Sequence, residues 1–336
     1  MKAESRKPRK AKEKPISLNA PYYSTEMGQA FLGDSLDVLK EIPDRSVNLI
    51  LTSPPFALTR KKEYGNKSSE EYVDWFLQFA GDFKRVLTKD GSLVLDLGSA
   101  YLPGFPIRSI YQFELLIRLV NGYGFFLAQD FYHYNPSRLP TPAEWVTIRR
   151  IRVKDSINTV WWLSVSEFPK ADNRQVLKPY SESMKKLLKN GYKPKLRPSG
   201  HDISDKFQKD NQGAIPPNLL ELANTESNSA YLRRCREVGI KPHPARFPEG
   251  LADFFIRFLT CEGDMVLDPF AGSNTTGFVA ERLRRRWIAI EINENYLDGS
   301  IYRFQEVDDL FPVIRRIDAT ANQVATVRES RTGNRR

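Results

Sequence analysis

The chain has 336 residues and a formal net charge of +10, with 40% hydrophobic and 27% charged residues. This composition is typical of a folded protein with one large or two ordinary domains. No run approaches the roughly eighteen apolar residues of a membrane span, and no apolar stretch follows the basic N-terminus as in a secretory signal. Two cysteines and three histidines have the spacing of neither a metal site nor a disulfide framework. We therefore expect an intracellular protein that holds no metal.

The positive charge is concentrated in three segments. Residues 1–14 carry a net charge of +5, residues 138–200 carry +9 and residues 327–336 carry +3, so the remainder of the chain is acidic. Local positive charge of this kind favours a polyanion-binding surface on an otherwise ordinary protein body. For the two tails, simple solvation is an equal alternative. The internal segment also carries interleaved aromatic residues, which favours nucleic acid: Trp145, Trp161, Trp162, Tyr180 and Tyr192.

Strands and helices alternate in the first part of the chain. Residues 1–17 lack periodicity and are predicted to form a disordered basic arm. Ser68 and Glu71 have capping-box spacing at the start of a helix, and residues 89–91 are predicted to turn. The predicted elements are a strand over 30–34, a helix over 35–42, a strand over 47–52, a helix over 69–87, a strand over 92–97, a helix over 109–120 and a strand over 125–134.

The alternation stops near residue 136 and returns near residue 248. Between them, prolines and basic residues dominate, with one clear strand over 158–165. The later elements are a helix over 248–260, a strand over 265–268, a helix over 275–285, a strand over 287–291 and a helix over 294–304. This pattern predicts an α/β fold, a parallel sheet with helices on both faces, interrupted by an irregular basic insert.

Residues 268–277, with the sequence DPFAGSNTTG, join a strand to a helix through small residues that let a ligand approach the helix N-terminus. Glu291 ends the next strand, where a carboxylate can accept hydrogen bonds from ribose hydroxyls. The dinucleotide and P-loop motifs are absent. Asp268 would repel a pyrophosphate but could hold an ammonium group, which favours a nucleoside with a cationic amino-acid tail, such as S-adenosylmethionine. A strand–turn–helix without ligand is an equal alternative for this loop alone.

A second motif, Ser53-Pro54-Pro55-Phe56, directly follows the buried strand over 47–52. Two prolines stiffen the backbone and remove two N–H donors, so carbonyl oxygens there can point into a pocket beside a flat aromatic ring. Such a site can accept hydrogen bonds from an exocyclic amino group and stack on its base. A proline-stiffened loop with a buried phenylalanine is the alternative, but it is rarer at the carboxyl end of a central strand, where α/β sheets place active sites.

Together these motifs resemble those of the β-class DNA amino-methyltransferases, specifically the cytosine-N4 type, which has Ser-Pro-Pro-Tyr/Phe. The resemblance covers roughly residues 20–305. Asn274 stands where the family usually has a second glycine, and asparagine tolerates left-handed backbone angles. The supporting stretches are PYYSTEMG, GDSLDVLKEIPDRSVNLILTSPPFAL, RKKEYGN, RPSGHDI, IPPNLL, HPARFP and GSNTTG.

The resemblance implies a Rossmann-like S-adenosylmethionine-dependent methyltransferase sheet. Because the catalytic motif precedes the cofactor motif, it also implies a circularly permuted sheet, with the basic insert as the target-recognition region. The expected division is a disordered basic arm (1–17), a catalytic part (18–137), a target-recognition region (138–240), a cofactor-binding part (241–310) and a basic C-terminal tail (311–336).

The resemblance also implies roles for individual residues. Ser53 and the Pro54 carbonyl would accept the N–H groups of the cytosine N4, and Phe56 would stack on the flipped base. Pro55 stiffens the motif, and Asp96 would hydrogen-bond Ser53 or help to remove the proton, with a structural carboxylate as the alternative. The expected cofactor-binding residues are Asp34, Asp268, Phe270, Gly272, Ser273, Thr275, Glu291, His243 and Arg246. The expected DNA contacts are Arg197, Ser199, His201 and Asp202.

The implied partner is double-stranded DNA, with CAGCTG as the suggested target and a cognate restriction endonuclease as a functional partner. We expect a monomer without membrane contact, in the cytoplasm of a prokaryote and associated with its nucleoid. Three alternatives remain: adenine-N6 methylation of DNA, methylation of RNA or of a protein amide, and a catalytically inactive DNA-binding regulator. Covalent C5-cytosine methylation is excluded, because neither Cys235 nor Cys261 follows a proline.

Overall fold

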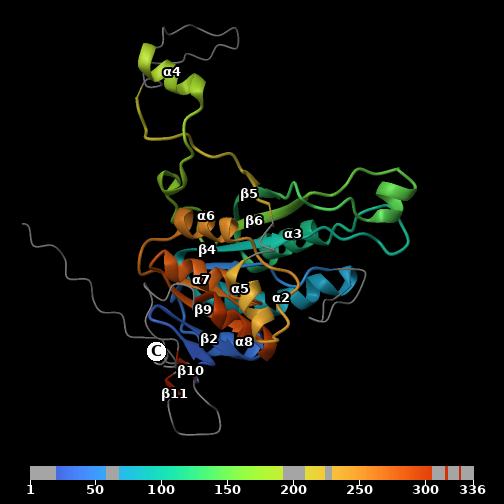
Figure 1. Ribbon diagram of the computed structural model, residues 1–336, viewed down its shortest axis with the longest axis vertical. Helices are drawn as coiled ribbons and strands as arrows, with labels where there is room; N and C mark the ends of the chain where they lie inside the picture. Colours follow the sequence, from blue (N-terminus) through green and yellow to red (C-terminus); the bar gives the residue numbers. More distant parts are fainter. Residues whose placement is uncertain are drawn as a thin grey trace, which may run out of the picture.

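The computed structural model describes most of the chain (Figure 1). Within this part, no helix has the length and apolar character needed to cross a membrane. The described residues are 20–57, 68–191, 209–223 and 229–304, together with the backbone of 315–316 and 325–326.

In these residues, eleven strands form one mixed sheet. The strands are β1 (Tyr23–Ser24), β2 (Gly28–Leu32), β3 (Val47–Thr52), β4 (Leu87–Leu97), β5 (Phe126–Tyr134), β6 (Ile157–Ser164), β7 (Leu219–Glu221), β8 (Met265–Asp268), β9 (Arg286–Glu291), β10 (Arg315–Arg316) and β11 (Ala325–Thr326). Their order across the sheet is β11-β10-β1-β2-β9-β8-β3-β4-β6-β5-β7. The sheet therefore places β8 and β9, from late in the chain, between β2 and β3.

The described helices lie between these strands in the chain. They are α1 (Ser35–Glu41), α2 (Ser69–Val86), α3 (Tyr111–Tyr123), the π-helix η1 (Glu144–Ile148), the 3-10 helix η2 (Asn173–Val176), α4 (Glu182–Asn190), α5 (Ala230–Glu237), α6 (Glu249–Leu259), α7 (Thr275–Arg282) and α8 (Glu294–Phe304). The Ser68 hydroxyl accepts a hydrogen bond from the Glu71 N–H at 3.3 Å, which confirms the predicted start of α2.

The sheet is not wholly parallel, and this part of the prediction was wrong. Strands β2, β9, β8, β3 and β4 run parallel to one another, but β1 lies antiparallel beside β2, and β6 lies antiparallel between β4 and β5. A parallel return requires a crossover along one face of the sheet. The chain between β5 and β6 instead projects away from the sheet, to the right in Figure 1, and comes back beside β5. Strand β6, inside the predicted target-recognition region, is thus part of the central sheet.

Two apolar layers enclose the sheet and give a three-layer α/β/α core. Buried side chains of α2 and α3 pack on one face, against residues such as Ile50 and Leu95. Buried side chains of α6, α7 and α8 pack on the other face, against residues such as Leu51 and Val266. Neighbouring positions of a strand point to opposite faces, so Ile50 and Leu51 belong to different layers. Helices on both faces were predicted, and the structure confirms them.

Some element boundaries differ from the prediction. The expected turn at residues 89–91 is part of β4, because α2 passes directly into this strand and Leu87 already pairs with Val47 of β3. The helix α7 ends at Arg282, three residues early, because Arg284 takes a left-handed backbone with φ of 60°. The short or polar elements α4, α5 and β7 were not predicted. In Figure 1, α4 stands away from the sheet at the top of the view.

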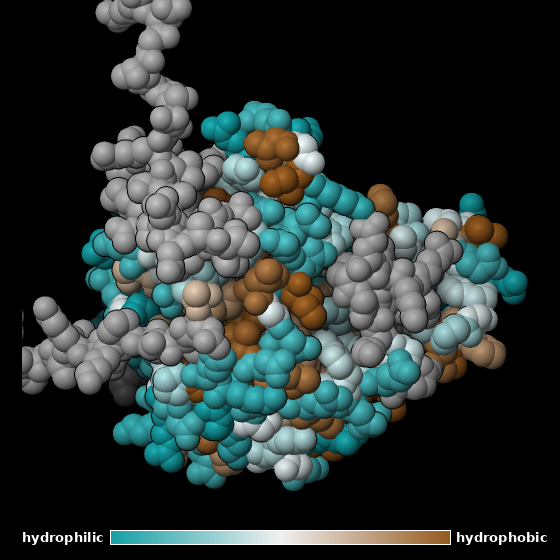
Figure 2. Space-filling view, turned by 90° about the horizontal axis from the view of Figure 1, so that it is seen from below, coloured by the Kyte–Doolittle hydropathy of each residue, from teal (hydrophilic) through white to brown (hydrophobic). Residues whose placement is uncertain are grey.

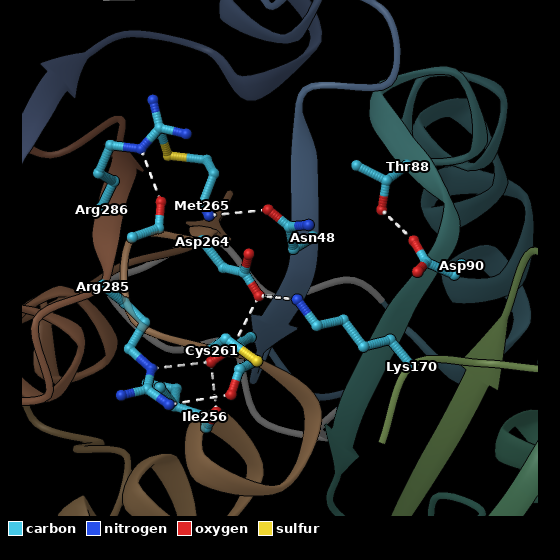
Figure 3. Close-up of polar contacts among 12 residues, drawn as sticks. Asn48, Thr88, Asp90, Lys170, Ile256, Cys261, Asp264, Met265, Arg285 and Arg286 are labelled. Carbon is cyan, nitrogen blue, oxygen red and sulfur yellow. Dashed lines mark hydrogen bonds and ion pairs between the residues drawn. The ribbon is translucent and has the colours of Figure 1, made fainter. Parts of the chain in front are cut away.

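The amino ends of the central strands are joined by polar contacts (Figure 3). Asp264, just before β8, accepts a hydrogen bond from the Cys261 N–H at 2.7 Å and forms an ion pair with Lys170. Asn48 of β3 accepts a hydrogen bond from the Met265 N–H at 2.9 Å. These contacts hold the segment after β6 and the start of β8 to one edge of the sheet. The carboxyl ends of the strands, at the opposite side of the sheet, do not take part in these contacts and are where the functional site lies.

The surface seen from below in the view of Figure 1 is mostly hydrophilic (Figure 2). Hydrophobic side chains gather near the centre of this face, between hydrophilic margins. Scattered apolar residues are usual on a protein surface, so this view by itself assigns no binding function.

Candidate active site

The carboxyl ends of the parallel strands open into a cavity of about 690 Å³. It lies where ligands bind in open α/β sheets, and its volume is within the usual range for a small-molecule site. Residues from the two ends of the described chain line it together. From the predicted set these are Ser53, Pro54, Pro55, Phe56, Asp96, Asp34, Asp268, Phe270, Gly272, Ser273, Glu291, His243 and Arg246.

The predicted catalytic motif begins directly after β3. The Ser53 hydroxyl lies 3.3 Å from the Asp96 carboxylate oxygen Oδ2 and 3.3 Å from the Asp96 main-chain oxygen. The Phe56 ring lies against Gly98, where an added Cβ would come within 2.3 Å of the ring. Gly98, which the sequence analysis did not single out, therefore gives the Phe56 ring the space it occupies.

Asp96 is buried at the end of β4, and burial raises the pKa of its carboxyl group. Its Oδ2 accepts hydrogen bonds from the Ser53 hydroxyl and, at 3.4 Å, from the Asn158 side-chain amide. Its Oδ1 is buried without a hydrogen-bond partner in the described part of the chain. A buried carboxylate oxygen without a donor is costly, so a ligand that brings an N–H group here would be favoured.

The predicted cofactor loop has the left-handed backbone expected of it. Gly272 and Asn274 have φ angles of 54° and 52°. The Asn274 side chain caps α7 by accepting a hydrogen bond from the Gly277 N–H at 3.0 Å, and it donates to the Tyr23 hydroxyl at 2.8 Å. The expectation that Asn274 tolerates this conformation is thereby confirmed.

Asp268 orders the first part of this loop. Its Oδ1 accepts hydrogen bonds from the Thr52 hydroxyl at 2.7 Å and the Phe270 N–H at 3.1 Å, and its Oδ2 accepts one from the Thr276 hydroxyl at 2.7 Å. Burial raises the pKa of Asp268. The carboxylate therefore already joins β3 to the loop and α7, and its expected contact with an ammonium group stays a prediction.

Two further carboxylates lie at the ends of β9 and β2. Glu291 accepts hydrogen bonds from the Gly272 N–H at 2.8 Å and the Asn293 N–H at 2.9 Å, and burial raises its pKa. Asp34 caps α1 by accepting a hydrogen bond from the Leu36 N–H at 2.9 Å. Both carboxylates line the cavity, on the side away from Asp96 in the strand order.

Rings form much of the wall on the cofactor-loop side. Phe270 packs against Trp75 and Phe79, with ring centroids 5.6 and 5.1 Å apart. His243 contacts the Tyr296 ring edge-on at 4.4 Å. Burial lowers the pKa of His243 to about 4, so its imidazole is neutral at pH 7. The Phe270 ring suits a flat group, and the neutral His243 imidazole adds no positive charge of its own to the cavity.

Several residues of the cavity region were not predicted. Arg303 of α8 donates to the Ser273 main-chain oxygen at 2.8 Å and to its hydroxyl at 3.0 Å, which supports the loop from behind. Trp75, His133, Arg138 and Asn158 line the cavity. The available signal for Arg138 was its position as the first basic residue of the segment 138–200, four residues after the end of β5. For His133 on β5 and Asn158 on β6 the sequence carried no signal, because their hydrogen-bond partners depend on the register between strands.

Other predicted site residues are not brought to the cavity. Thr275 is buried behind the loop, and its hydroxyl has no hydrogen-bond partner in the described ranges. The four expected DNA contacts, Arg197, Ser199, His201 and Asp202, lie outside the described residues. Across the residues that the structure covers, no group of three or more His, Cys, Asp or Glu side chains could hold a metal ion.

A Rossmann-like sheet with a small-molecule cavity at its carboxyl edge is an architecture that several enzyme classes share, methyltransferases among them. The family model described as DNA methylase matches residues 47–302. The chain belongs to this DNA methylase family.

Individual relatives agree with this assignment. The chain is 57% identical over 287 residues to the type II methyltransferase M.PvuII of Proteus hauseri, covering 84% of this chain and 85% of the relative. It also resembles the solved structure of the PvuII DNA methyltransferase (cytosine-N4-specific), with 47% identity, a TM-score of 0.71 and coverage of 87% and 94% of the two chains. A more distant structure, a DNA modification methylase from Thermus thermophilus complexed with S-adenosyl-L-methionine, has 19% identity, a TM-score of 0.52 and coverage of 82% and 93%. This last likeness concerns the fold alone.

Proposed function

We propose that this enzyme transfers a methyl group from S-adenosylmethionine to the exocyclic N4 of cytosine in duplex DNA. The observation that carries the proposal is that Ser53-Pro54-Pro55-Phe56 and the cofactor loop open into one cavity. The motif of Ser53 suits an amino group on a base, and the loop suits a methyl donor. The likeness to M.PvuII, and to the solved structure of the cytosine-N4-specific PvuII DNA methyltransferase, supports the same activity.

The cofactor half of the cavity fits S-adenosylmethionine. Glu291 would hold the ribose and Asp34 the adenine amino group, while Phe270 offers a ring face to the adenine. Gly272, Ser273, His243, Arg246 and Asp268 would surround the methionine end. When bound, the cofactor supplies an electrophilic methyl group on a sulfonium. Because His243 is neutral at pH 7, it adds no positive charge beside that sulfonium.

The chain's own part in the reaction is to position and polarise the amino group. The lone pair of N4 is delocalised into the cytosine ring, which makes the nitrogen a poor nucleophile. Ser53 and the Pro54 carbonyl would accept its N–H groups, and the Oδ1 of Asp96 has the free lone pair to accept one as well. These hydrogen bonds localise the lone pair toward the methyl group. The amino nitrogen gives up one of its protons as it gains the methyl group, and the carboxylate of Asp96 would receive this proton at Oδ1. Alignment in the cavity supplies much of the rate.

Duplex DNA must present this cytosine outside its stack, because the cavity cannot reach a paired base. Phe56, with its ring in the space that Gly98 leaves, is placed to stack on the flipped base. The basic insert within residues 138–240 would bind the DNA backbone, with Arg197, Ser199, His201 and Asp202 as its proposed contacts in or beside the cleft.

The same proposal includes the setting of the enzyme. Its target would be CAGCTG, and its partner in function would be a restriction endonuclease that cuts unmodified copies of this sequence. We propose a monomer in the cytoplasm of a prokaryote, associated with the nucleoid, because each strand of a palindrome can be methylated separately. A single subunit mass by light scattering in the presence and absence of DNA would support the monomer.

The test is to incubate the full chain with S-adenosylmethionine and two matched duplexes, one with CAGCTG and one with a scrambled site. Nucleosides from the digested DNA are then analysed by mass spectrometry. We expect N4-methylcytosine only in the first duplex, and its loss in Ser53→Ala with cofactor binding retained.

Other outcomes would contradict the proposal in separable ways. N6-methyladenine would overturn the substrate while leaving the fold and cofactor in place. Methylation of both duplexes would overturn the target sequence. Bound cofactor with no methylated base would favour the inactive regulator or a substrate other than DNA.

A further inference from the structure

A row of polar side chains runs from the catalytic motif across three strands of the sheet. Ser53 follows β3, Asp96 lies on β4, Asn158 on β6 and His133 on β5. Asp96 pairs with Val160, two residues after Asn158, and His133 pairs with Asn158. Residues two apart in a strand share a face, so Asp96, Asn158 and His133 point to the same side. All of them line the cavity.

The hydrogen bonds along this row have a fixed direction. Arg138 donates from Nη1 to the Asn158 oxygen Oδ1 at 3.1 Å, and Asn158 donates from Nδ2 to the Asp96 oxygen Oδ2 at 3.4 Å. A guanidinium has donors only, so Arg138 obliges the amide to turn its NH₂ group toward the carboxylate. Without Arg138, the amide could rotate and present its oxygen to Asp96, which would repel it.

We propose that Asn158 and Arg138 are positioning residues, which hold the Asp96 carboxylate so that its Oδ1 meets the amino group of the flipped cytosine. This inference rests on the proposed function. Ser53 and Asn158 together occupy Oδ2, and Oδ1 remains as the buried acceptor without a donor in the described residues. The rotamer of Asp96 thus depends on a residue of β6 and, through it, on Arg138.

The position of Arg138 gives the row a second consequence. Arg138 is the first cation of the basic segment 138–200 and also lines the cavity. A shift of this segment would therefore reach Asp96 through two hydrogen bonds. The geometry thus couples the basic segment 138–200, which is proposed to bind DNA, to the Asp96 carboxylate, which is proposed to accept a hydrogen bond from the cytosine N4 amino group.

Charges around Asp96 set the expected pH dependence. Burial raises the pKa of Asp96, and His133 on β5, Asn158, Ser53 and Arg138 lower it. Tyr111 of α3 also interacts with Asp96, and burial raises the pKa of this phenol, which keeps it neutral. Removing the donor of Asn158 or the charge of Arg138 destabilises the ionised carboxylate. The pKa of Asp96 would then rise further.

The test compares Asn158→Leu and Arg138→Met with the wild-type full chain, using the CAGCTG duplex at saturating substrate over a range of pH. Leucine keeps the approximate shape of asparagine, and methionine keeps the stem of arginine. We expect kcat to fall about a hundredfold because the acceptor is displaced, with the KM for DNA and the affinity for S-adenosylmethionine unchanged. The acid limb of kcat should move up by about one pH unit, as for the loss of one hydrogen bond to a charged group.

Arg138→Lys, which keeps a charge and a donor, should recover most of kcat. The matched control is Arg118→Met on α3, which removes an exposed ion pair with Asp74 away from the cavity and should leave kcat unchanged. Because Arg138 is only half-buried, its variants remain informative even if Asn158→Leu does not fold.

Three results would overturn the inference. Wild-type kcat and pH profile in Asn158→Leu would show that the row does not act on Asp96. A raised KM for DNA with unchanged kcat in Arg138→Met would make Arg138 a phosphate contact instead. A lowered kcat with an unmoved acid limb in both variants would indicate a structural role only. Failure of the wild type to form N4-methylcytosine, by contrast, would contradict the proposed function itself.

Discussion

At the scale of single residues, the carboxylates of the cavity differ in whether the chain's own hydrogen bonds occupy both of their oxygens. Asp96 has one oxygen occupied by Ser53 and Asn158 and one oxygen without a donor in the described residues. The carboxylates of Asp268 and Glu291, by contrast, each accept hydrogen bonds at both oxygens from the chain itself. Asp268 and Glu291 therefore order the chain around them, whereas Asp96 keeps one oxygen for a ligand. Burial raises the pKa of all three carboxyl groups.

Gly98 offers the sharpest test at this scale. In Gly98→Ala the new Cβ would lie 2.3 Å from the Phe56 ring, so the ring must move from the place where we propose the base to stack. We expect kcat/KM for DNA to fall about tenfold or more, while calorimetry shows cofactor binding unchanged.

The control for this change is Gly122→Ala on α3, where an added Cβ meets nothing within 4 Å. It should leave activity unchanged and stabilise the helix by roughly 0.5–1 kcal/mol. Full activity in Gly98→Ala would show that the position of the Phe56 ring does not matter for the reaction.

At the scale of elements, α8 and the cofactor loop behave as one unit. Arg303 is almost fully buried, with 2% of its side chain exposed. Its guanidinium donates to Ser273, pairs with Glu249 at 3.5 Å and lies over the Tyr231 ring at 4.5 Å. This support from α8 adds to the hydrogen bonds that Asp268 and Asn274 make within the loop.

Arg303→Met should loosen the loop while it preserves the apolar stem. We expect the Kd for S-adenosylmethionine to rise at least about tenfold, which a loss of about 1.4 kcal/mol produces. The free energy of unfolding should fall by about 3 kcal/mol, because the partners of a buried cation are left behind. Titration calorimetry and urea unfolding measure the two effects.

Arg282→Met is the matched control, because Arg282 pairs with the same Glu249, at 3.3 Å, from an exposed position on α7. It should change neither quantity by more than about 0.5 kcal/mol. Equal effects of the two substitutions would mean that the ion pair with Glu249, and not the contact with Ser273, is what matters.

Periodicity predicted most elements because it reflects burial. The strand over 47–52 and the strand over 265–268 have the predicted bounds, and both are apolar runs buried in the sheet. Strand direction was not readable in the same way. The antiparallel place of β6 depends on how the chain returns after β5, and a single run of apolar residues carries no information about its neighbours.

The same limit applies to the site. Motifs with unusual local chemistry, such as Ser53-Pro54-Pro55-Phe56 and the loop around Gly272, were visible because prolines and glycines dictate backbone shape. Contacts made across strands, such as Asn158 with Asp96, depend on register and became visible only in three dimensions. Of the expected cofactor contacts, Thr275 alone does not line the cavity, because it is buried as the first residue of α7.

At the scale of the whole molecule, the amino ends and the carboxyl ends of the sheet strands have different functions. The polar contacts around Asp264 join the amino ends of the strands (Figure 3), whereas the cavity lies at their carboxyl ends. Stability and activity should therefore be separable by substitutions at opposite edges.

Asp264→Ala tests this separation. It removes the acceptor of the Cys261 N–H and the partner of Lys170, so we expect the free energy of unfolding to fall by about 1–3 kcal/mol. Below the melting temperature, kcat and KM should be those of the wild type. Asp37→Ala, which breaks an exposed pair with Lys40, should be close to neutral. A lowered kcat without a change in stability would show that the edges are coupled.

The place of β8 and β9 in the middle of the sheet also affects how the protein is made. When a ribosome has delivered residue 264, both flanks of the parallel sheet exist, but the two strands that separate β2 from β3 do not. Neither flank can complete the cavity, since the cofactor loop and Glu291 have yet to emerge. Domains begin to fold while synthesis continues, yet the centre of this sheet stays incomplete until β8 and β9 are inserted. A chain that has not yet reached Glu291 would therefore lack the cofactor half of the cavity and be unable to modify DNA.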